Sequence, residues 1–189
     1  MPLDTAFFAR DPETVARDLL GRHLVHGEAA ELRGRIVETE AYHGPDDPAS
    51  HASSGKTQRN APMFEEPGKA YIYVSYGIHH MLNVVTGAAG DPSVVLVRAV
   101  KPLAGTGRMR ERRGVDAGEA LCSGPGKLCE AFGITTEHNR VDLTGGALRI
   151  EDGKAVEADD TCVDTRIGVS GGEDLELRFY EDGSDYVSR

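Results

Sequence analysis

The spacing of hydrophobic and polar residues predicts a short amphipathic helix near the start of the chain. Asp11 can cap its first turn, Pro12 suits its first position, and Gly21 can end it. The apolar positions of this stretch form a stripe on one helical face: Val15, Leu19 and Leu20. These signals agree, so we expect one helix here.

The rest of the chain is dominated by strand-like segments rich in Val, Ile and Tyr, separated by Gly, Pro and Asp turns. The first group of expected strands is Arg35–Tyr42, Ala70–Tyr76, His79–Thr86 and Val94–Val100. A short helix follows Pro125 and ends near Gly133. The later expected strands are Ala147–Glu151, Arg166–Val169 and Leu175–Tyr180. With 23 Gly and 9 Pro, this pattern favours a mostly antiparallel α+β fold.

Length and composition favour one domain. The chain has 189 residues, of which 39% are hydrophobic, and no linker divides it, so we expect a single domain over residues 1–189. Three cysteines without a CxxC pair support neither a disulfide framework nor a zinc site. The first residues do not resemble a signal peptide, and no apolar run reaches the ~18 residues of a membrane span. We therefore expect a cytoplasmic protein without a membrane partner.

The net charge of −10 at first argues against a nucleic-acid partner. The charge is unevenly distributed, however. Residues 136–189 contain 6 Lys/Arg and 14 Asp/Glu, a net charge of −8, whereas residues 98–127 contain 7 and 3, a net charge of +4. We therefore expect a basic face around residues 108–113 and 123–127.

One strand combines carboxylates with an aromatic ring. Alternation along Arg35–Tyr42 places these side chains on one face: Ile36, Glu38, Glu40 and Tyr42. A carboxylate beside an aromatic ring suits the hydrolysis of a bond next to a flat substrate. The alternative is a solvent-facing pair of glutamates beside a Tyr at the rim of the sheet.

A second strand carries a cation in an apolar setting. The segment VVLVRAV is apolar on both faces, which is typical of a fully buried strand, yet it contains Arg98. A buried guanidinium requires an anionic partner, because its unpaired desolvation costs several kcal/mol. Glu40 is the candidate partner. Alternatively, Arg98 extends to solvent at the end of the strand.

Three tyrosines lie within six residues. Tyr71 and Tyr73 share a strand face, where tyrosines commonly pack against the neighbouring strand. Tyr76 points the other way and meets Gly77 at an expected hairpin turn. Packing explains a tyrosine at such a tip less well, and it can act as a wedge in a base stack.

Two further groups of residues are candidate ligand sites. His51, His79 and His80 match no metal-ligand spacing, so we expect no metal and no cofactor. The turn Ser123-Gly124-Pro125-Gly126-Lys127 does not fit the P-loop pattern, because leucines occupy the required Gly and Ser/Thr positions. It still opens a helix, whose free N–H groups and Lys127 can hold one backbone phosphate. The run RMRERR is typical of a solvated loop.

These segments together resemble one family. The stretches RIVETEAYHGPDDPASH, RNAPMF, AYIYVSYGIHHMLNVV, VLVRAV, LCSGPGKLC, TRIGV and LRFYEDGSDYVS follow the order found in the alkyladenine (3-methyladenine) DNA glycosylase family. The resemblance covers nearly the whole chain. It implies an α+β domain around a curved antiparallel sheet, similar to the formyltransferase C-terminal-domain-like open barrel.

The resemblance also implies an activity. Members of this family flip a damaged purine out of double-stranded DNA and hydrolyse its N-glycosidic bond without a cofactor, and we expect a monomer. By motif position, Glu40 resembles the general base that activates water, and Arg98 resembles the residue that helps to hold that water and the carboxylate.

Matching by motif position assigns the remaining expected roles. The walls that stack on the flipped base are implied to be Tyr42, His51 and Tyr73. Asn83 resembles a pocket residue that disfavours normal guanine, and Tyr76 resembles the wedge that fills the gap in the duplex. The expected backbone-phosphate contacts are Ser123, Gly124 and Lys127.

Two other functions remain open at this point. One is a non-catalytic nucleic-acid-binding module on the same fold, which does not need the pair of Glu40 and Arg98. The other is a metal-dependent hydrolase that uses the histidines.

Overall fold

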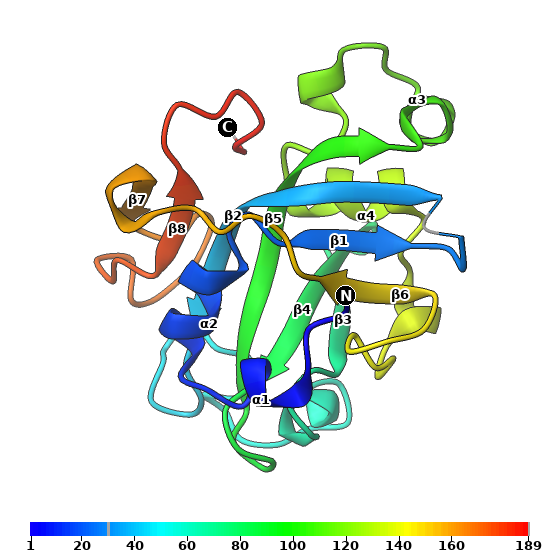
Figure 1. Cartoon of the computed structure of the whole chain (residues 1–189). Coiled ribbons are helices and arrows are strands. Elements are labelled where there is room, and N and C mark those ends of the chain that lie inside the picture. The colour runs from blue at the N-terminus through cyan, green and yellow to red at the C-terminus, as the bar shows by residue number, and fades with distance from the viewer. Residues whose placement is uncertain (30, 189) are drawn as a thin grey trace.

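Antiparallel strands form one sheet of eight in the computed structural model, which describes residues 1–29 and 31–188 (Figure 1). The strands in chain order are β1 (His23–His26), β2 (Leu32–Tyr42), β3 (Ala70–Ser75), β4 (His79–Thr86), β5 (Ser93–Ala104), β6 (Leu148–Glu151), β7 (Thr161–Asp164) and β8 (Arg178–Glu181). The helices are α1 (Thr5–Phe8), α2 (Pro12–Leu19), α3 (Thr106–Arg113) and α4 (Pro125–Phe132). Short 3₁₀ turns cover Ala61–Phe64, Gly118–Ala120, Thr136–His138 and Ala158–Asp160.

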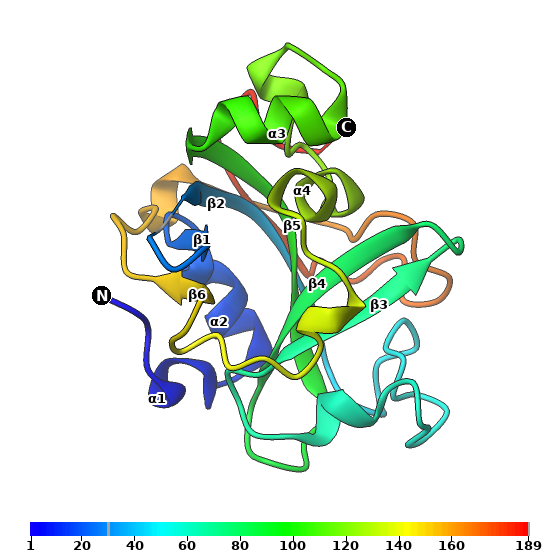
Figure 2. The same cartoon turned by 90° about the vertical axis from the view of Figure 1, so that its right-hand side faces the viewer.

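The strand order places the long β2 at a branch of the sheet. The main path is β3-β4-β5-β2-β1-β6, while β8 pairs with both β2 and β7. β2 and β5 bend along their length, and the hairpin of β3 and β4 projects at the right of the view in Figure 2. The expected α+β fold around a curved antiparallel sheet is therefore confirmed.

β2 is irregular where it pairs with β5. The register shifts between Ile36 and Glu38, where two residues of β2 correspond to one step along β5. It shifts back between Glu38 and Thr39, where the extra residue, Arg98, belongs to β5. Such bulges bend a strand and redirect its side chains. Ile36 consequently packs in the apolar core, whereas Glu38 and Glu40 both contact Arg98. The expectation that Ile36 shares their face was wrong for this reason.

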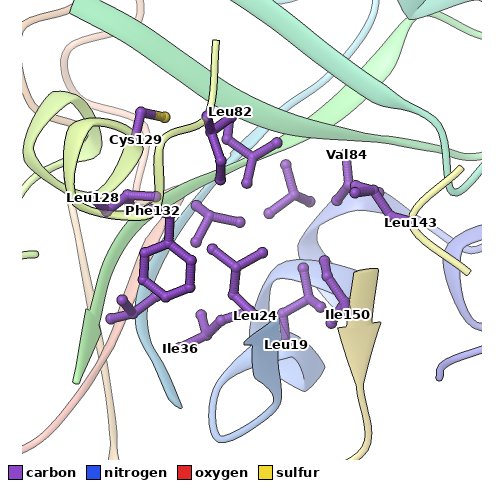
Figure 3. Packing of buried hydrophobic residues seen from close by; sticks show 14 of the residues in the cluster. Leu19, Leu24, Ile36, Leu82, Val84, Leu128, Cys129, Phe132, Leu143 and Ile150 are labelled. Carbon is purple, nitrogen blue, oxygen red and sulfur yellow. The ribbon is translucent and has the colours of Figure 1, made fainter. Parts of the chain in front are cut away.

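The apolar core joins the sheet to its helices. Figure 3 shows side chains of α2, β1, β2, β4, α4 and β6 converging, with the ring of Phe132 between α4 and β2. Leu19 and Phe132 are fully buried. The Thr39 hydroxyl of β2 also donates a 2.8 Å hydrogen bond to the Ala16 carbonyl of α2. The same core thereby joins β2 to both helices.

Most expected elements are present. The Asp11 side chain accepts hydrogen bonds from the N–H groups of Glu13 and Thr14, so it caps α2 as predicted. The strands predicted between residues 35 and 100 and the helix after Pro125 are confirmed, with β2 and β5 longer than expected. The expected strand at Leu175–Tyr180 begins later, at Arg178.

One expected strand is absent from the described residues. Arg166–Val169 is irregular, because the Ile167 N–H donates to a side chain, Glu40, rather than to a neighbouring strand. Gly168 also adopts a positive φ of +70°, which breaks extended structure. The strand in this region is β7, which pairs with β8. The pattern also missed β1, the short α1, and α3, which replaces the expected loop at Arg108–Arg113.

Within the part of the chain that the structure describes, no helix has both the length and the apolar character needed to cross a membrane.

Removal of the Phe132 ring tests the core. We expect Phe132→Ala to lower the free energy of unfolding by about 3–5 kcal/mol, because a buried ring is replaced by a cavity. Phe132→Leu should lower the free energy of unfolding by a smaller amount. Leu103→Ala, at a side chain that is 45% exposed, should change stability by no more than about 0.5 kcal/mol. Urea unfolding measures all three, and a loss below about 1 kcal/mol for Phe132→Ala would contradict the packing described.

Candidate active site

A cavity of about 680 Å³ lies where the β3–β4 hairpin meets two loops, residues 48–54 and 168–170. Its lining includes all four expected pocket residues and the expected wedge residue: Tyr42, His51, Tyr73, Asn83 and Tyr76. Residues from Tyr42 to Ser170 therefore meet at one cavity. The cavity is large enough for a flat bicyclic ring.

Glu40 lies directly behind the wall of this cavity. Its side chain is fully buried, and one of its oxygens, Oε2, accepts a 2.8 Å hydrogen bond from the hydroxyl of Tyr42. The other oxygen, Oε1, accepts a 2.8 Å hydrogen bond from the Ile167 N–H. Ile167 precedes Gly168, which lines the cavity. The carboxylate is thus held between two cavity-lining segments.

Arg98 completes the surroundings of Glu40. Its Nη1 lies 3.1 Å from Glu40 Oε1, and its side chain is only 8% exposed. The interpretation in which Arg98 extends to solvent is therefore wrong, and the predicted pairing with Glu40 is confirmed. Sequence reasoning missed Glu38 as a second partner, whose Oε1 lies 3.2 Å from Arg98 Nε.

Tyr42 is held in its protonated form. Burial raises the pKa of its phenol, and the neighbouring Glu40 carboxylate raises this pKa further. The hydroxyl therefore donates to Glu40 at neutral pH. The Arg166 guanidinium lies over the Tyr42 ring, 4.6 Å from the ring centroid. At this distance a cation is attracted to an aromatic ring.

The far wall of the cavity is aromatic. The His51 ring lies edge-on to Tyr73, with centroids 4.5 Å apart, and its Nδ1 is 2.8 Å from the hydroxyl of Tyr71. Burial lowers the pKa of His51, and the nearby Arg59 guanidinium lowers it further, so the ring is neutral at pH 7. The sequence pattern assigned Tyr71 to packing, and this tyrosine is buried while also lining the cavity.

Asn83 forms part of the cavity from β4. It lies opposite Tyr71 across the β3–β4 pairing, and its side-chain amide donates to the carbonyls of Tyr71 and Met81. The side chain is almost fully buried, at 2% exposure. These bonds fix the amide so that its position in the cavity does not depend on a ligand.

Tyr76 stands at the tip of the β3–β4 hairpin. Both Tyr76 and Gly77 have positive φ, and the Ile78 N–H donates to the Ser75 carbonyl, as in a type I′ turn. The Tyr76 side chain is 91% exposed, and Ile78 beside it is 71% exposed. The turn therefore presents two large apolar side chains to solvent next to the cavity.

The turn at residues 123–127 opens α4 close to this hairpin. Gly124 adopts a positive φ and precedes Pro125, the first helical residue. Gly126 lies against the His79 ring of β4, so close that an added Cβ would be 3.1 Å from it. Lys127 is exposed, in a hollow shared with Glu119 and Asp185. The structure therefore places the expected phosphate turn beside the hairpin.

The expected basic face is weaker than the local charge count predicts. Arg108 forms an ion pair with Glu31, and Arg113 forms one with Glu130. Arg112 donates to the Ala131 carbonyl. Both acidic partners lie outside residues 98–127, so a count along the sequence cannot include them. Lys127 and Arg110 remain exposed there.

Sequence reasoning also missed a buried ion pair beside the cavity. Arg166 and Asp47 form a bidentate pair, with contacts of 2.6 and 2.9 Å, and both side chains are almost fully buried. Arg166 also donates to the Ala41 carbonyl of β2. The pair joins the loop that carries His51 to the segment that carries Ile167. No local pattern signals it, because 119 residues separate the partners.

Metal ligands do not gather in the described residues: no group of three or more His, Cys, Asp or Glu side chains is placed to hold a metal ion.

The fold and the site define an α+β protein with a buried carboxylate–guanidinium cluster beside an aromatic cavity. The sequence model of the family described as methylpurine-DNA glycosylase (MPG) matches residues 6–185. The chain belongs to this family, and it is a DNA glycosylase, a hydrolase of the repair of alkylated DNA.

Curated relatives agree with this assignment. Proteins provisionally named 3-methyladenine DNA glycosylase from Methanoculleus marisnigri and Carboxydothermus hydrogenoformans are each 47% identical, and the alignments cover 100% of both chains. A protein of the same provisional name from Salinibacter ruber is 45% identical over 99% of this chain and 96% of its own length. The similarity thus spans every segment that contributes to the site.

The buried Asp47–Arg166 pair makes stability depend on pH. Burial opposes ionisation of Asp47, but hydrogen bonds from Arg166, Ala49 and His43 outweigh it and lower the Asp47 pKa below its ordinary 3.8. A carboxyl group whose pKa is lower in the folded than in the unfolded state stabilises the fold at pH values above its unfolded-state pKa. This stabilisation is lost as the pH falls through the folded-state pKa. We expect Asp47→Asn to cost about 3–5 kcal/mol at pH 7, because it leaves Arg166 buried and unpaired.

The difference from wild type should shrink below about pH 3.8, which urea unfolding at pH 7 and pH 3 measures. Asp18→Asn removes an exposed pair with Arg10 and serves as control, with an expected loss of about 1 kcal/mol or less. A difference between Asp47→Asn and wild type that stays constant with pH would contradict the assignment.

Proposed function

We propose that this glycosylase takes an alkylated purine out of double-stranded DNA into the cavity and hydrolyses its N-glycosidic bond, leaving an abasic site. The proposed substrates are 3-methyladenine and 7-methylguanine, together with the neutral bases hypoxanthine and ethenoadenine. The observation that carries the proposal is the fixed carboxylate of Glu40 behind an aromatic cavity. We further propose that residues 1–189 act as one domain and as a monomer, in the cytoplasm at the nucleoid.

Glu40 is the proposed general base. Cleavage of the glycosidic bond passes through a sugar with oxocarbenium character, which a nearby carboxylate stabilises. Glu40 Oε2 accepts one hydrogen bond, from Tyr42, and a carboxylate oxygen has capacity for a second donor. A water bound there can give up its proton to Glu40 as it attacks the anomeric carbon. Arg98, which pairs with the Glu40 carboxylate, is proposed to help hold this water.

The cavity suits a flat base with a positive charge. The neutral His51 ring does not repel a cationic base, and Tyr42 and Tyr73 offer aromatic faces for stacking, worth ~1–3 kcal/mol per base. Cationic bases such as 3-methyladenine are already good leaving groups, whereas neutral bases require protonation or polarisation. The fixed amide of Asn83 is the proposed element that disfavours guanine.

The lining of the cavity supports simple hydrolysis rather than strand cleavage. The described residues that line the cavity include no lysine, so no amine is placed there to attack the sugar.

Extrusion of the base costs a few kcal/mol, and insertion of Tyr76 into the vacated space is proposed to offset part of this cost. Ser123, Gly124 and Lys127 are the proposed contacts to a backbone phosphate.

The alternatives make different predictions for one assay. Four duplexes, each with one of the proposed substrate bases, are incubated with the protein, and alkali then cleaves the DNA at any abasic site. A non-catalytic binding module leaves no abasic product, and a metal-dependent hydrolase loses activity in EDTA. We expect alkali-labile product with and without EDTA.

Substitution of the proposed base tests the mechanism. We expect Glu40→Gln to lower the single-turnover excision rate by at least about 10²-fold, because the amide cannot accept the proton from water. Affinity for lesion-containing DNA should remain within about threefold, since the amide keeps the size of the carboxylate. Unchanged excision by this variant would refute the role of Glu40. Glu151→Gln, at a doubly paired glutamate on β6, is the matched control.

Removal of the proposed wedge tests base extrusion. We expect Tyr76→Ala to weaken the flipped state by about tenfold, because stacking of the ring in the duplex is lost. Fluorescence of 2-aminopurine beside the lesion measures this change. Leu103→Ala removes another exposed apolar side chain and should leave the signal unchanged. Equal fluorescence for wild type and Tyr76→Ala would count against the wedge.

A further inference from the structure

Glu38 lies in the site cluster without touching the cavity. Its side chain is fully buried, and it belongs to β2 two residues before Glu40. Its carboxylate accepts a 2.7 Å hydrogen bond from the Ser188 N–H and a 2.8 Å bond from the Ser188 hydroxyl. Arg98 and Arg178 each donate to it at 3.2 Å. Four donors from three segments thus fix one carboxylate.

Arg98 uses different nitrogens for the two glutamates. Its Nε donates to Glu38, whereas its Nη1 contacts Glu40. The Ser188 hydroxyl oxygen lies 3.2 Å from Arg98 Nη2 and 3.4 Å from Nε. A guanidinium is planar, so contacts at Nε and Nη2 determine where Nη1 points. Glu38 and Ser188 therefore set the direction in which Arg98 meets Glu40.

We infer that Glu38, together with Ser188, is a positioning residue that orients Arg98 toward Glu40. The inference rests on the proposed hydrolysis by a Glu40-activated water. Glu38 touches neither the cavity nor the reacting atoms, so its effect on the reaction passes through Arg98. Loss of this contact slows the chemical step while the binding of DNA persists.

A purely structural role makes a different prediction. If Glu38 only ties the segment around Ser188 to β2, its loss lowers stability and affects the rate independently of Arg98. A double-mutant cycle separates the two cases, because residues that act through one another give non-additive effects. The relevant variants are Glu38→Gln, Arg98→Gln and the pair combined.

The measurements are single-turnover excision from a 7-methylguanine duplex, the Kd for the same duplex, and urea unfolding. We expect Glu38→Gln to slow excision by at least about tenfold, with a Kd within about threefold of wild type. In the Arg98→Gln background, the same change should slow excision by less than about twofold. Ser188→Ala keeps the charges of Glu38 and Arg98 and should slow excision severalfold. Glu151→Gln, a paired glutamate far from the cavity, should match wild type.

Each outcome decides the inference. Excision at the wild-type rate by Glu38→Gln, or equal losses in both backgrounds, overturns it. If Glu38→Gln does not fold, Ser188→Ala decides, and a wild-type rate for that variant overturns the inference. Inactive Glu40→Gln with fully active Glu38→Gln overturns the inference and leaves the proposed function intact. Absence of excision by wild type overturns both.

Discussion

The buried guanidinium of Arg98 is the constraint on which the centre of this protein depends. An unpaired guanidinium in the interior costs several kcal/mol, so the fold must bring anions to it. β2 supplies two carboxylates, and a shift in register separates Glu38 and Glu40, which both contact this cation, from Ile36 in the apolar core. The segment around Ser188 closes the cluster from the far end of the chain. An irregular strand and a segment from the far end of the chain thus both contribute to the surroundings of the Arg98 guanidinium.

The cavity wall is built on this cluster and on a second buried pair. Arg166 and Asp47 join the loop that carries His51 to the segment whose Ile167 N–H binds Glu40. Both cavity loops are irregular, and few ladder hydrogen bonds support them. The ion pairs therefore provide in the loops the rigidity that the sheet provides elsewhere. A site with this support is organised before a ligand enters.

Local signals in the sequence predicted the parts of the fold that depend on near neighbours. Asp11 and Pro12 define the start of α2, and the need of a buried Arg98 for an anion identified Glu40. The contacts of Glu38 with Ser188 and of Asp47 with Arg166 join residues 150 and 119 positions apart. No periodicity reveals such contacts. The basic run at 108–113 was misjudged for the same reason, because Glu31 and Glu130 neutralise part of it.

Gly126 lies between the hairpin that carries the proposed wedge, Tyr76, and the turn that is proposed to contact a backbone phosphate. It lies against the His79 side chain at the tip end of β4, and a Cβ at position 126 would be only 3.1 Å from that side chain. The separation between the hairpin tip and the turn that opens α4 is consequently set by protein packing. Under the proposed function, a bound duplex has to adapt to this fixed spacing.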